Sequence, residues 1–161
     1  MPTVSEAMGK AILHVALVEP EIAPNVGNIA RLTAAIGARL HLIGRLGFRL
    51  DDRHLRRAGL DYWPAIELER HDDWGTFQAK FAGNRLLAIE CGSPRSYTRF
   101  AFEPGDCLVF GSESKGLGAG VLADCVANLS VPMPSCRVRS LNLANTVAIV
   151  AYEAIRQFGF A

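Results

Sequence analysis

The sequence lacks any long apolar run. None of its hydrophobic stretches approaches the roughly 20 consecutive apolar residues of a membrane-spanning helix. Residues 1–9 also lack the continuous apolar region of a signal peptide, and we expect them to form a flexible leader. These absences predict a cytoplasmic protein with no membrane partner, and the chain length predicts one domain over residues 10–161.

Cysteines in metal-binding or redox spacing are also absent. The four cysteines are Cys91, Cys107, Cys125 and Cys136. They show no Cys-x-x-Cys pattern, and several lie inside apolar runs, which disfavours a zinc site or a redox pair. We therefore expect reduced core thiols and no metal.

The sequence has little excess charge of either sign. The formal net charge is +1, so attraction of the whole molecule cannot bring a polyanion to it, and any nucleic-acid surface must be local. Six arginines crowd one short stretch: Arg39, Arg45, Arg49, Arg53, Arg56 and Arg57. A guanidinium can form two parallel hydrogen bonds to the oxygens of one phosphate, and it can stack on bases. The alternative is a solvated helix face, because Asp51, Asp52 and Asp61 would neutralise half of the cluster.

Short β-type runs alternate with helical patterns along the chain. Residues 12–18, 40–43, 86–90, 107–110 and 126–131 read as buried strands. A helix is expected after a possible Asn25 cap and before Gly37, and Asp72 or Asp73 could cap a second helix. The alternation predicts the α/β class, with a single-domain, mostly parallel sheet and helices on both faces.

The last predicted helix, from about residue 143 to 158, carries a wide apolar stripe. Such a helix needs cover on more than one side, either from the core or from a second subunit. We favour a homodimer.

Ligands of parallel sheets bind beyond the carboxyl ends of the strands, and three loops there carry unusual residues. In the first loop, Asn25 and Asn28 supply amides and Gly27 allows close backbone contact. Taken alone, a helix start of this kind, capped by Asn, is more often purely structural. It does not explain Arg31, because a cation near a helix N-terminus is unfavourable without an anionic partner such as phosphate.

The second loop, residues 110–120, is rich in glycine. Gly111 and Gly116 have the spacing of a Walker loop, but Leu117 stands where that loop needs lysine. The glycines at 116, 118 and 120 do not give a dinucleotide-binding pattern either. Glu113 would repel nucleotide phosphates, so the loop favours a cationic or neutral ligand.

The third loop, residues 131–145, joins the last strand to the last helix. Ser140 or Asn142 could simply cap that helix. The same polar residues suit an adenosine pocket, in which the backbone at Val131 and Leu141 reads the adenine edge and Met133 packs on the ring.

Taken in order, the loops resemble the three motifs of the SpoU branch of the SPOUT superfamily of RNA methyltransferases. Asn25-Val-Gly27-Asn28-Ile-Ala-Arg31 resembles motif one, and the run from Phe110 to Leu117 resembles motif two. Residues 131–133 with 140–145 resemble motif three. Within the branch, the chain is most similar to small enzymes that methylate the wobble cytidine or uridine of tRNA, and this likeness covers nearly all of it from residue 12.

The resemblance implies a C-terminal deep trefoil knot, an obligate homodimer and S-adenosylmethionine as cofactor. The partner would be tRNA, with leucine tRNA the expected species, and not DNA. Another tRNA or ribosomal RNA site, or a non-catalytic RNA-binding module, is the alternative function. The implied cofactor-binding residues are Ile89, Gly111, Glu113, Gly116, Val131, Met133, Ser140 and Leu141.

The resemblance also assigns Arg31, Asn25 and Asn142 to catalysis. A guanidinium stays protonated and rarely serves as a base, so Arg31 is expected to orient the target phosphate or polarise the ribose hydroxyl. Asn25 and Asn142 would hold the site together. The residues expected to bind the RNA backbone are Arg53, Arg56, Arg57 and Arg139.

Overall fold

The computed structural model describes residues 11–51, 53 and 64–160. Six parallel strands form one sheet in the order β3-β2-β1-β5-β4-β6. The strands are β1 (His14–Val18), β2 (Arg39–Ile43), β3 (Leu68–His71), β4 (Leu86–Ile89), β5 (Cys107–Phe110) and β6 (Ala127–Leu129). The predicted α/β class with a parallel sheet is confirmed.

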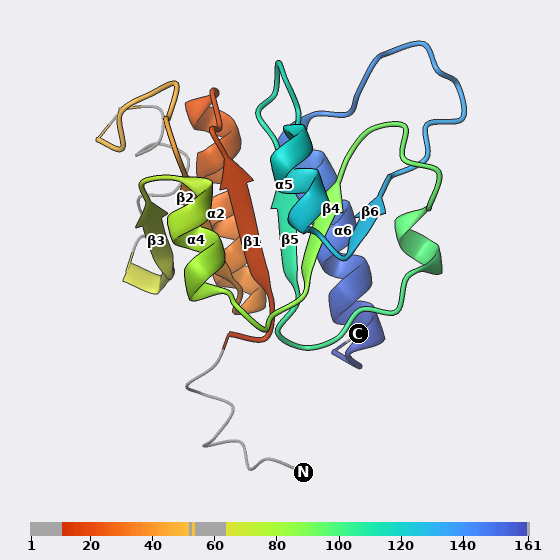
Figure 1. The fold of residues 1–161 in the computed structure, drawn as a ribbon, viewed down its shortest axis with the longest axis horizontal. Coiled ribbons are helices and arrows are strands. Elements are labelled where there is room, and N and C mark those ends of the chain that lie inside the picture. The colour runs from red at the N-terminus through yellow and green to blue at the C-terminus, as the bar shows by residue number, and fades with distance from the viewer. Residues whose placement is uncertain (1–10, 52, 54–63, 161) are drawn as a thin grey trace.

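Helices cover both faces of the sheet (Figure 1). The long helices α2 (Ala23–Ile36) and α6 (Leu143–Gln157) lie side by side on one face. The shorter helices α4 (Trp74–Lys80) and α5 (Ala119–Asp124) lie on the other, and a 3-10 turn, η2 (Tyr97–Arg99), follows β4. None of the described helices is long and apolar enough to cross a membrane.

Side chains of β1 alternate between the two faces and so build two cores. Val15 and Leu17 are fully buried in the core beneath α2 and α6, whereas Ala16 packs in the core beneath α4 with Phe77. Burying a large apolar side chain contributes about 1.5–3 kcal/mol, which explains why both faces need helices.

The prediction that Asn25 caps α2 is wrong. Ile22 occupies the cap position and makes no side-chain hydrogen bond, while a proline in the first turn sets the helical backbone. Asn25 lies inside the helix and is buried, and its side chain bonds to another loop instead. The predicted end is confirmed, because Gly37 has the left-handed φ of 67°.

Two other helix starts follow the sequence prediction. The Asp73 carboxylate accepts a hydrogen bond from the Thr76 N–H at 2.7 Å and caps α4. Asn142, and not Ser140, caps α6 by accepting from the Asn145 N–H at 3.2 Å. The apolar stripe of α6 faces the sheet, and its outer side leaves Ile149 and Tyr152 exposed.

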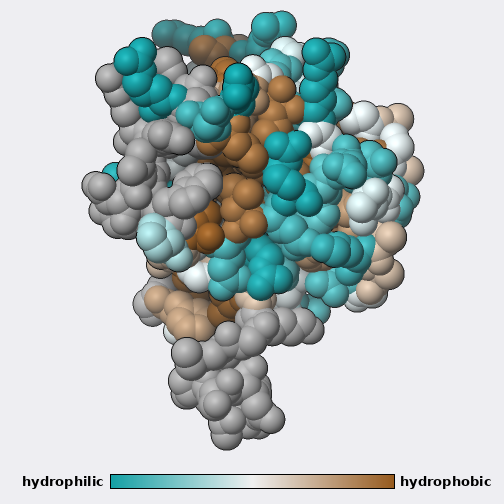
Figure 2. All heavy atoms as spheres, turned by 90° about the vertical axis from the view of Figure 1, so that its left-hand side faces the viewer, coloured by the Kyte–Doolittle hydropathy of each residue, from teal (hydrophilic) through white to brown (hydrophobic). Residues whose placement is uncertain are grey.

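The β3 edge of the sheet was not predicted from the sequence. Apolar side chains near this edge, including Leu46, Ile66 and Leu68, are only partly buried against the core. Seen from this side, a band of apolar residues runs between hydrophilic ones (Figure 2). The predicted leader, residues 1–9, lies outside the described residues.

Candidate active site

A cavity of about 490 Å³ opens at the carboxyl ends of the central strands. It is formed by the ends of β4 and β5 together with the loops after β1, β5 and β6. Ten residues predicted from the sequence line it: Asn25, Ile89, Gly111, Glu113, Gly116, Val131, Met133, Ser140, Leu141 and Asn142. The structure therefore brings together all eight predicted cofactor residues and two of the three predicted catalytic residues.

Glu113 joins the second loop to the first. Its carboxylate accepts hydrogen bonds from the Glu21 N–H at 2.8 Å, the Ile22 N–H at 3.1 Å and the Asn25 side-chain amide at 3.1 Å. Two of these donors lie at the unsatisfied start of α2, where a negative charge is favourable. Glu113 thus has a positioning role in addition to lining the cavity.

A chain of amides carries the connection on to the third loop. The Asn142 side-chain amide donates to Asn25 Oδ1 at 3.0 Å, and Asn25 in turn donates to Glu113. Asn142 also caps α6, so its orientation is held from both sides. One hydrogen-bonded relay, from Asn142 through Asn25 to Glu113, therefore connects the three loops. Asn25 and Asn142 are more than 100 residues apart in the sequence.

Two glycines allow the tight turn of the second loop. A Cβ at Gly111 would lie 2.1 Å from the Gly116 carbonyl carbon, which no side chain can tolerate. Gly116 has a left-handed φ of 66°, and its N–H donates to the Ser112 carbonyl at 2.9 Å. The turn can fold back on itself only because both positions are glycine.

Glu90 lines the cavity but was not predicted as a site residue, because the sequence pattern placed it in the strand run 86–90. It directly follows β4, and its carboxylate accepts a hydrogen bond from the Leu117 N–H at 2.6 Å. Burial raises the pKa of the Glu90 carboxyl, and the Leu117 hydrogen bond partly offsets this effect. Lys115 and Thr146 also line the cavity without having been predicted.

The third loop is exposed along most of its length and is tied to the segment after β4. The Cys91 thiol donates to the Arg139 carbonyl at 3.0 Å, and nearby the Ser93 hydroxyl donates to the carbonyl of Asn128 in β6, just before the loop, at 2.7 Å. Leu141 keeps 37% of its surface exposed on the cavity wall. The loop therefore presents both backbone and apolar groups to a ligand.

None of the predicted cationic residues that the structure describes lines the cavity. Arg31, on α2, and Arg139 are exposed, and neither lines the cavity. Arg53 is exposed as well, while Arg56 and Arg57 lie outside the described residues. Within the arginine cluster, Arg39 pairs with Glu67 and Arg49 with Asp51, so part of its charge is neutralised.

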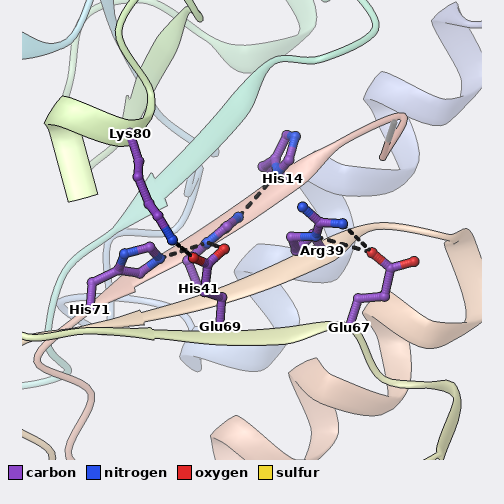
Figure 3. A network of polar contacts seen from close by, with 7 residues as sticks. All are labelled: His14, Arg39, His41, Glu67, Glu69, His71 and Lys80. Carbon is purple, nitrogen blue, oxygen red and sulfur yellow. Dashed lines mark hydrogen bonds and ion pairs between the residues drawn. The ribbon is translucent and has the colours of Figure 1, made fainter. Parts of the chain in front are cut away.

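A separate polar network lies on the α4 face of β1, β2 and β3 (Figure 3). His14 Nδ1 lies 3.0 Å from His41 Nε2, and His41 Nδ1 lies 3.0 Å from His71 Nε2. All three rings are buried. Burial, together with the neighbouring His14 and His71, lowers the pKa of His41 to about 3. Neutral imidazoles donate from one nitrogen and accept at the other, so the row satisfies its own bonds.

Part of this network has the donor set of a metal site. His41, Glu69 and His71 each offer a ligand atom within 4.8 Å of the others. However, the Lys80 ammonium forms an ion pair with Glu69 and occupies the place where a cation would approach that carboxylate. None of these residues lines the cavity. The expectation that the chain needs no metal stays a prediction.

Comparison with known proteins connects this cavity to a family. The model of the SpoU rRNA Methylase family matches residues 12–152. The chain is 52% identical to a tRNA (cytidine(34)-2′-O)-methyltransferase of Burkholderia pseudomallei (strain 1106a), an alignment covering 92% of this chain and 97% of the relative. It is 42% identical to the enzyme of the same name from Escherichia coli (strain K12), covering 92% and 96%.

Solved structures agree with the sequence comparison. A structure reported for the 2-OH methylation of C/U34 on tRNA superposes with a TM-score of 0.88 at 47% identity, covering 92% of this chain and 97% of that one. The SpoU methyltransferase AviRb from Streptomyces viridochromogenes, solved with AdoMet, superposes with a TM-score of 0.84 at 25% identity, covering 94% and 62%. From its sequence, its fold and the loops around its cavity, this chain belongs to the SpoU methylase family.

Proposed function

We propose that this chain is an S-adenosylmethionine-dependent tRNA methyltransferase acting on the ribose 2′-hydroxyl of the wobble nucleotide, cytidine or uridine 34, with leucine tRNA as the expected substrate. The observation that carries the proposal is the convergence of the three motif loops on one cavity. Relatives that share 42–52% of its residues over nearly their whole length carry this activity in their names.

The cavity suits an adenosine-containing, cationic cofactor. Its volume of about 490 Å³ lies within the range of small-molecule sites, roughly 300–1,000 Å³. Two carboxylates, Glu90 and Glu113, line it against one ammonium group, that of Lys115, and this excess of negative charge favours a ligand with positive charge. Ile89, Gly111, Gly116, Val131, Met133, Ser140 and Leu141 supply the backbone and apolar contacts. When bound, S-adenosylmethionine would supply the methyl group from its sulfonium.

The remaining task of the protein is alignment, which contributes several kcal/mol in a direct displacement. Asn25 and Asn142 hold the loops in register through their mutual hydrogen bond. Arg31 lies about two turns along α2 from Asn25, on the exposed side where RNA approaches. Because a guanidinium keeps its proton, Arg31 orients the target phosphate or polarises the hydroxyl, and the proton passes to a phosphate oxygen or to water.

Exposed arginines are suited to the RNA backbone. Arg139 lies on the loop that borders the cavity, and its side chain is exposed. Arg53 is exposed on the segment after β2, and Arg56 and Arg57 follow it in the sequence. We assign these four residues to phosphate contacts, because one guanidinium can donate two hydrogen bonds to the same phosphate.

Contacts of the segment 90–106 at both ends of α6 support the proposed C-terminal knot. Cys91 bonds to Arg139 just before the helix. At the other end of α6, the side chain of its last residue, Gln157, donates to the Phe100 carbonyl and accepts from the Phe102 N–H. Figure 1 shows this segment leaving β4, passing β6 and returning to β5. We propose that α6 is threaded through the loop so formed.

The homodimer belongs to the proposal too. Ile149 and Tyr152 leave apolar surface on the outer side of α6, and 54% of Tyr152 is exposed. A second copy covering α6 would bury them and would supply additional surface for tRNA. We place the enzyme in the cytoplasm, where its substrate is found.

Expression in Escherichia coli that lacks its own relative tests the function. Mass spectrometry of the tRNA should find the 2′-O-methyl group at nucleotide 34 restored by this chain, and not by Arg31→Ala. Arg39→Ala, at the opposite end of the sheet, is the matched control and should restore it fully. Methylation at another nucleotide would favour a different tRNA or ribosomal target. No methylation, together with no binding of S-adenosylmethionine, would favour a non-catalytic RNA-binding module.

A further inference from the structure

Two carboxylates line the cavity among the described residues, and Glu90 is the one that the loop relay does not use. It follows the last residue of β4, and its side chain lies over Gly116, where a Cβ would come within 2.9 Å of Oε1 and 3.0 Å of Oε2. The missing side chain at Gly116 therefore creates the seat of the carboxylate. The Leu117 N–H fixes one oxygen, Oε1, at 2.6 Å.

The second oxygen of Glu90 has spare accepting capacity. Among the described residues, the Glu90 carboxylate has one hydrogen-bond donor, the Leu117 N–H, and forms no ion pair. Desolvating a carboxylate is costly unless hydrogen-bond donors replace the lost water. Burial accordingly raises the pKa of Glu90. A ligand that enters the cavity with hydroxyl donors would relieve this cost.

We propose that Glu90 accepts hydrogen bonds from the ribose hydroxyls of the bound adenosine cofactor; this inference rests on the proposed function. A carboxylate only accepts hydrogen bonds, and a vicinal diol offers two donors on adjacent carbons. Acids that follow a strand of a parallel sheet bind ribose hydroxyls in other nucleotide sites for the same reason. Glu90 has this position, after β4 and beside the turn of Gly111 and Gly116.

Other parts of the cofactor have better-placed partners. The adenine edge needs both donors and acceptors, which the backbone of the loop containing Val131 and Leu141 provides. Glu113 already accepts three hydrogen bonds, so its oxygens are less available than those of Glu90. Glu90 is therefore the cavity acid that remains for the diol.

Calorimetric titration of Glu90→Gln tests the inference. The glutamine carbonyl can still accept from the Leu117 N–H, so the seat is preserved while the charge is lost. We expect S-adenosylmethionine and S-adenosylhomocysteine to bind about tenfold more weakly to the variant than to the wild type, because charge-assisted hydrogen bonds are about twice as strong as neutral ones. Their 2′,3′-dideoxyadenosyl analogue should bind both proteins equally.

Each other outcome overturns the inference. If Glu90→Gln weakens the dideoxy analogue as much as the parent, the residue is structural or contacts another part of the cofactor. If it weakens only S-adenosylmethionine, Glu90 contacts the sulfonium. If it weakens neither ligand, Glu90 makes no contact. Glu103→Gln, a surface carboxylate paired with Arg85, is the control and should bind all ligands as the wild type does. Failure of the wild type to bind either cofactor would instead refute the proposed function.

Discussion

The buried histidine row predicts a loss of stability in acid that can be calculated from the structure. In the folded protein, the pKa of His41 is lowered from 6.5 to about 3, first by burial and then by His14 and His71. In the unfolded chain, the imidazole takes up a proton near pH 6.5. Unfolding therefore binds a proton between these two values, and the contribution of His41 to stability is lost as the pH falls below about 6.5.

The size of the effect follows from proton linkage. At about pH 7 the two states differ little in protonation of His41, whereas at about pH 4.5 the unfolded state gains roughly 2.5 kcal/mol from this proton alone. The pKa of His71 is lowered too, by burial first, so it acts in the same direction. We expect the whole protein to become much less stable over this range.

Urea unfolding from pH 7 to pH 4.5 measures the prediction. His41→Gln removes the titrating group while retaining a donor and an acceptor, so its cost in free energy of unfolding should shrink by roughly 2.5 kcal/mol between the two pH values. Ile43→Val, two residues along the same strand face, is the control and should cost a constant amount of about 1 kcal/mol. An equal cost of His41→Gln at both pH values would refute the reasoning.

Three further substitutions test the site and its support. Gly111→Ala should abolish binding of S-adenosylmethionine in calorimetry, because its Cβ meets backbone at 2.1 Å, whereas Gly118→Ala, with nothing within 4 Å, should bind normally. Glu113→Gln should cost about 1–3 kcal/mol in urea unfolding, because one amide oxygen cannot replace a carboxylate that accepts three hydrogen bonds; an unchanged midpoint would contradict the relay. Arg85→Ala should cost about 3 kcal/mol, because it leaves the Asp106 carboxylate, 2% exposed, without its cation. Adding Asp106→Asn should recover part of that loss, and no recovery would contradict the pairing.

The strands and helix ends were predictable where one local rule decided them. Residues 107–110 form β5 as expected, because an apolar run of four residues is too short for a helix and fits a buried strand. Gly37 ends α2 because a left-handed residue is needed there. Asp73 caps α4 because its carboxylate reaches the Thr76 N–H in the first turn.

Prediction failed where tertiary contacts decided. β3 consists of Leu68, Glu69, Arg70 and His71, which read as polar, yet it pairs along β2 and buries His71 beneath α4. The helix α5 begins at Ala119, inside the glycine-rich stretch 110–120 that was expected to be a loop. Asparagine is common at helix caps, but the side-chain amide of Asn25 donates to Glu113, a partner 88 residues away that no local pattern reveals.

The loops that form the candidate site could be predicted from the sequence, but the hydrogen bonds that connect them could not. The motif resemblance named residues that the structure gathers around one cavity. Glu90 was not predicted as a site residue because it continues a strand pattern. Its position in the cavity depends on Gly116 and Leu117, which lie against its carboxylate. Glu113 was predicted as a ligand contact, and the structure adds its role in joining the first and second loops.

A crystal structure of the protein with S-adenosylhomocysteine tests the central claim most directly. We expect the adenosine to lie in the cavity between Gly111, Val131 and Ser140, with its ribose against Glu90, and α6 to pass through the loop of residues 90–106. A nucleoside bound elsewhere on the molecule, or an α6 that does not pass through that loop, would contradict the account.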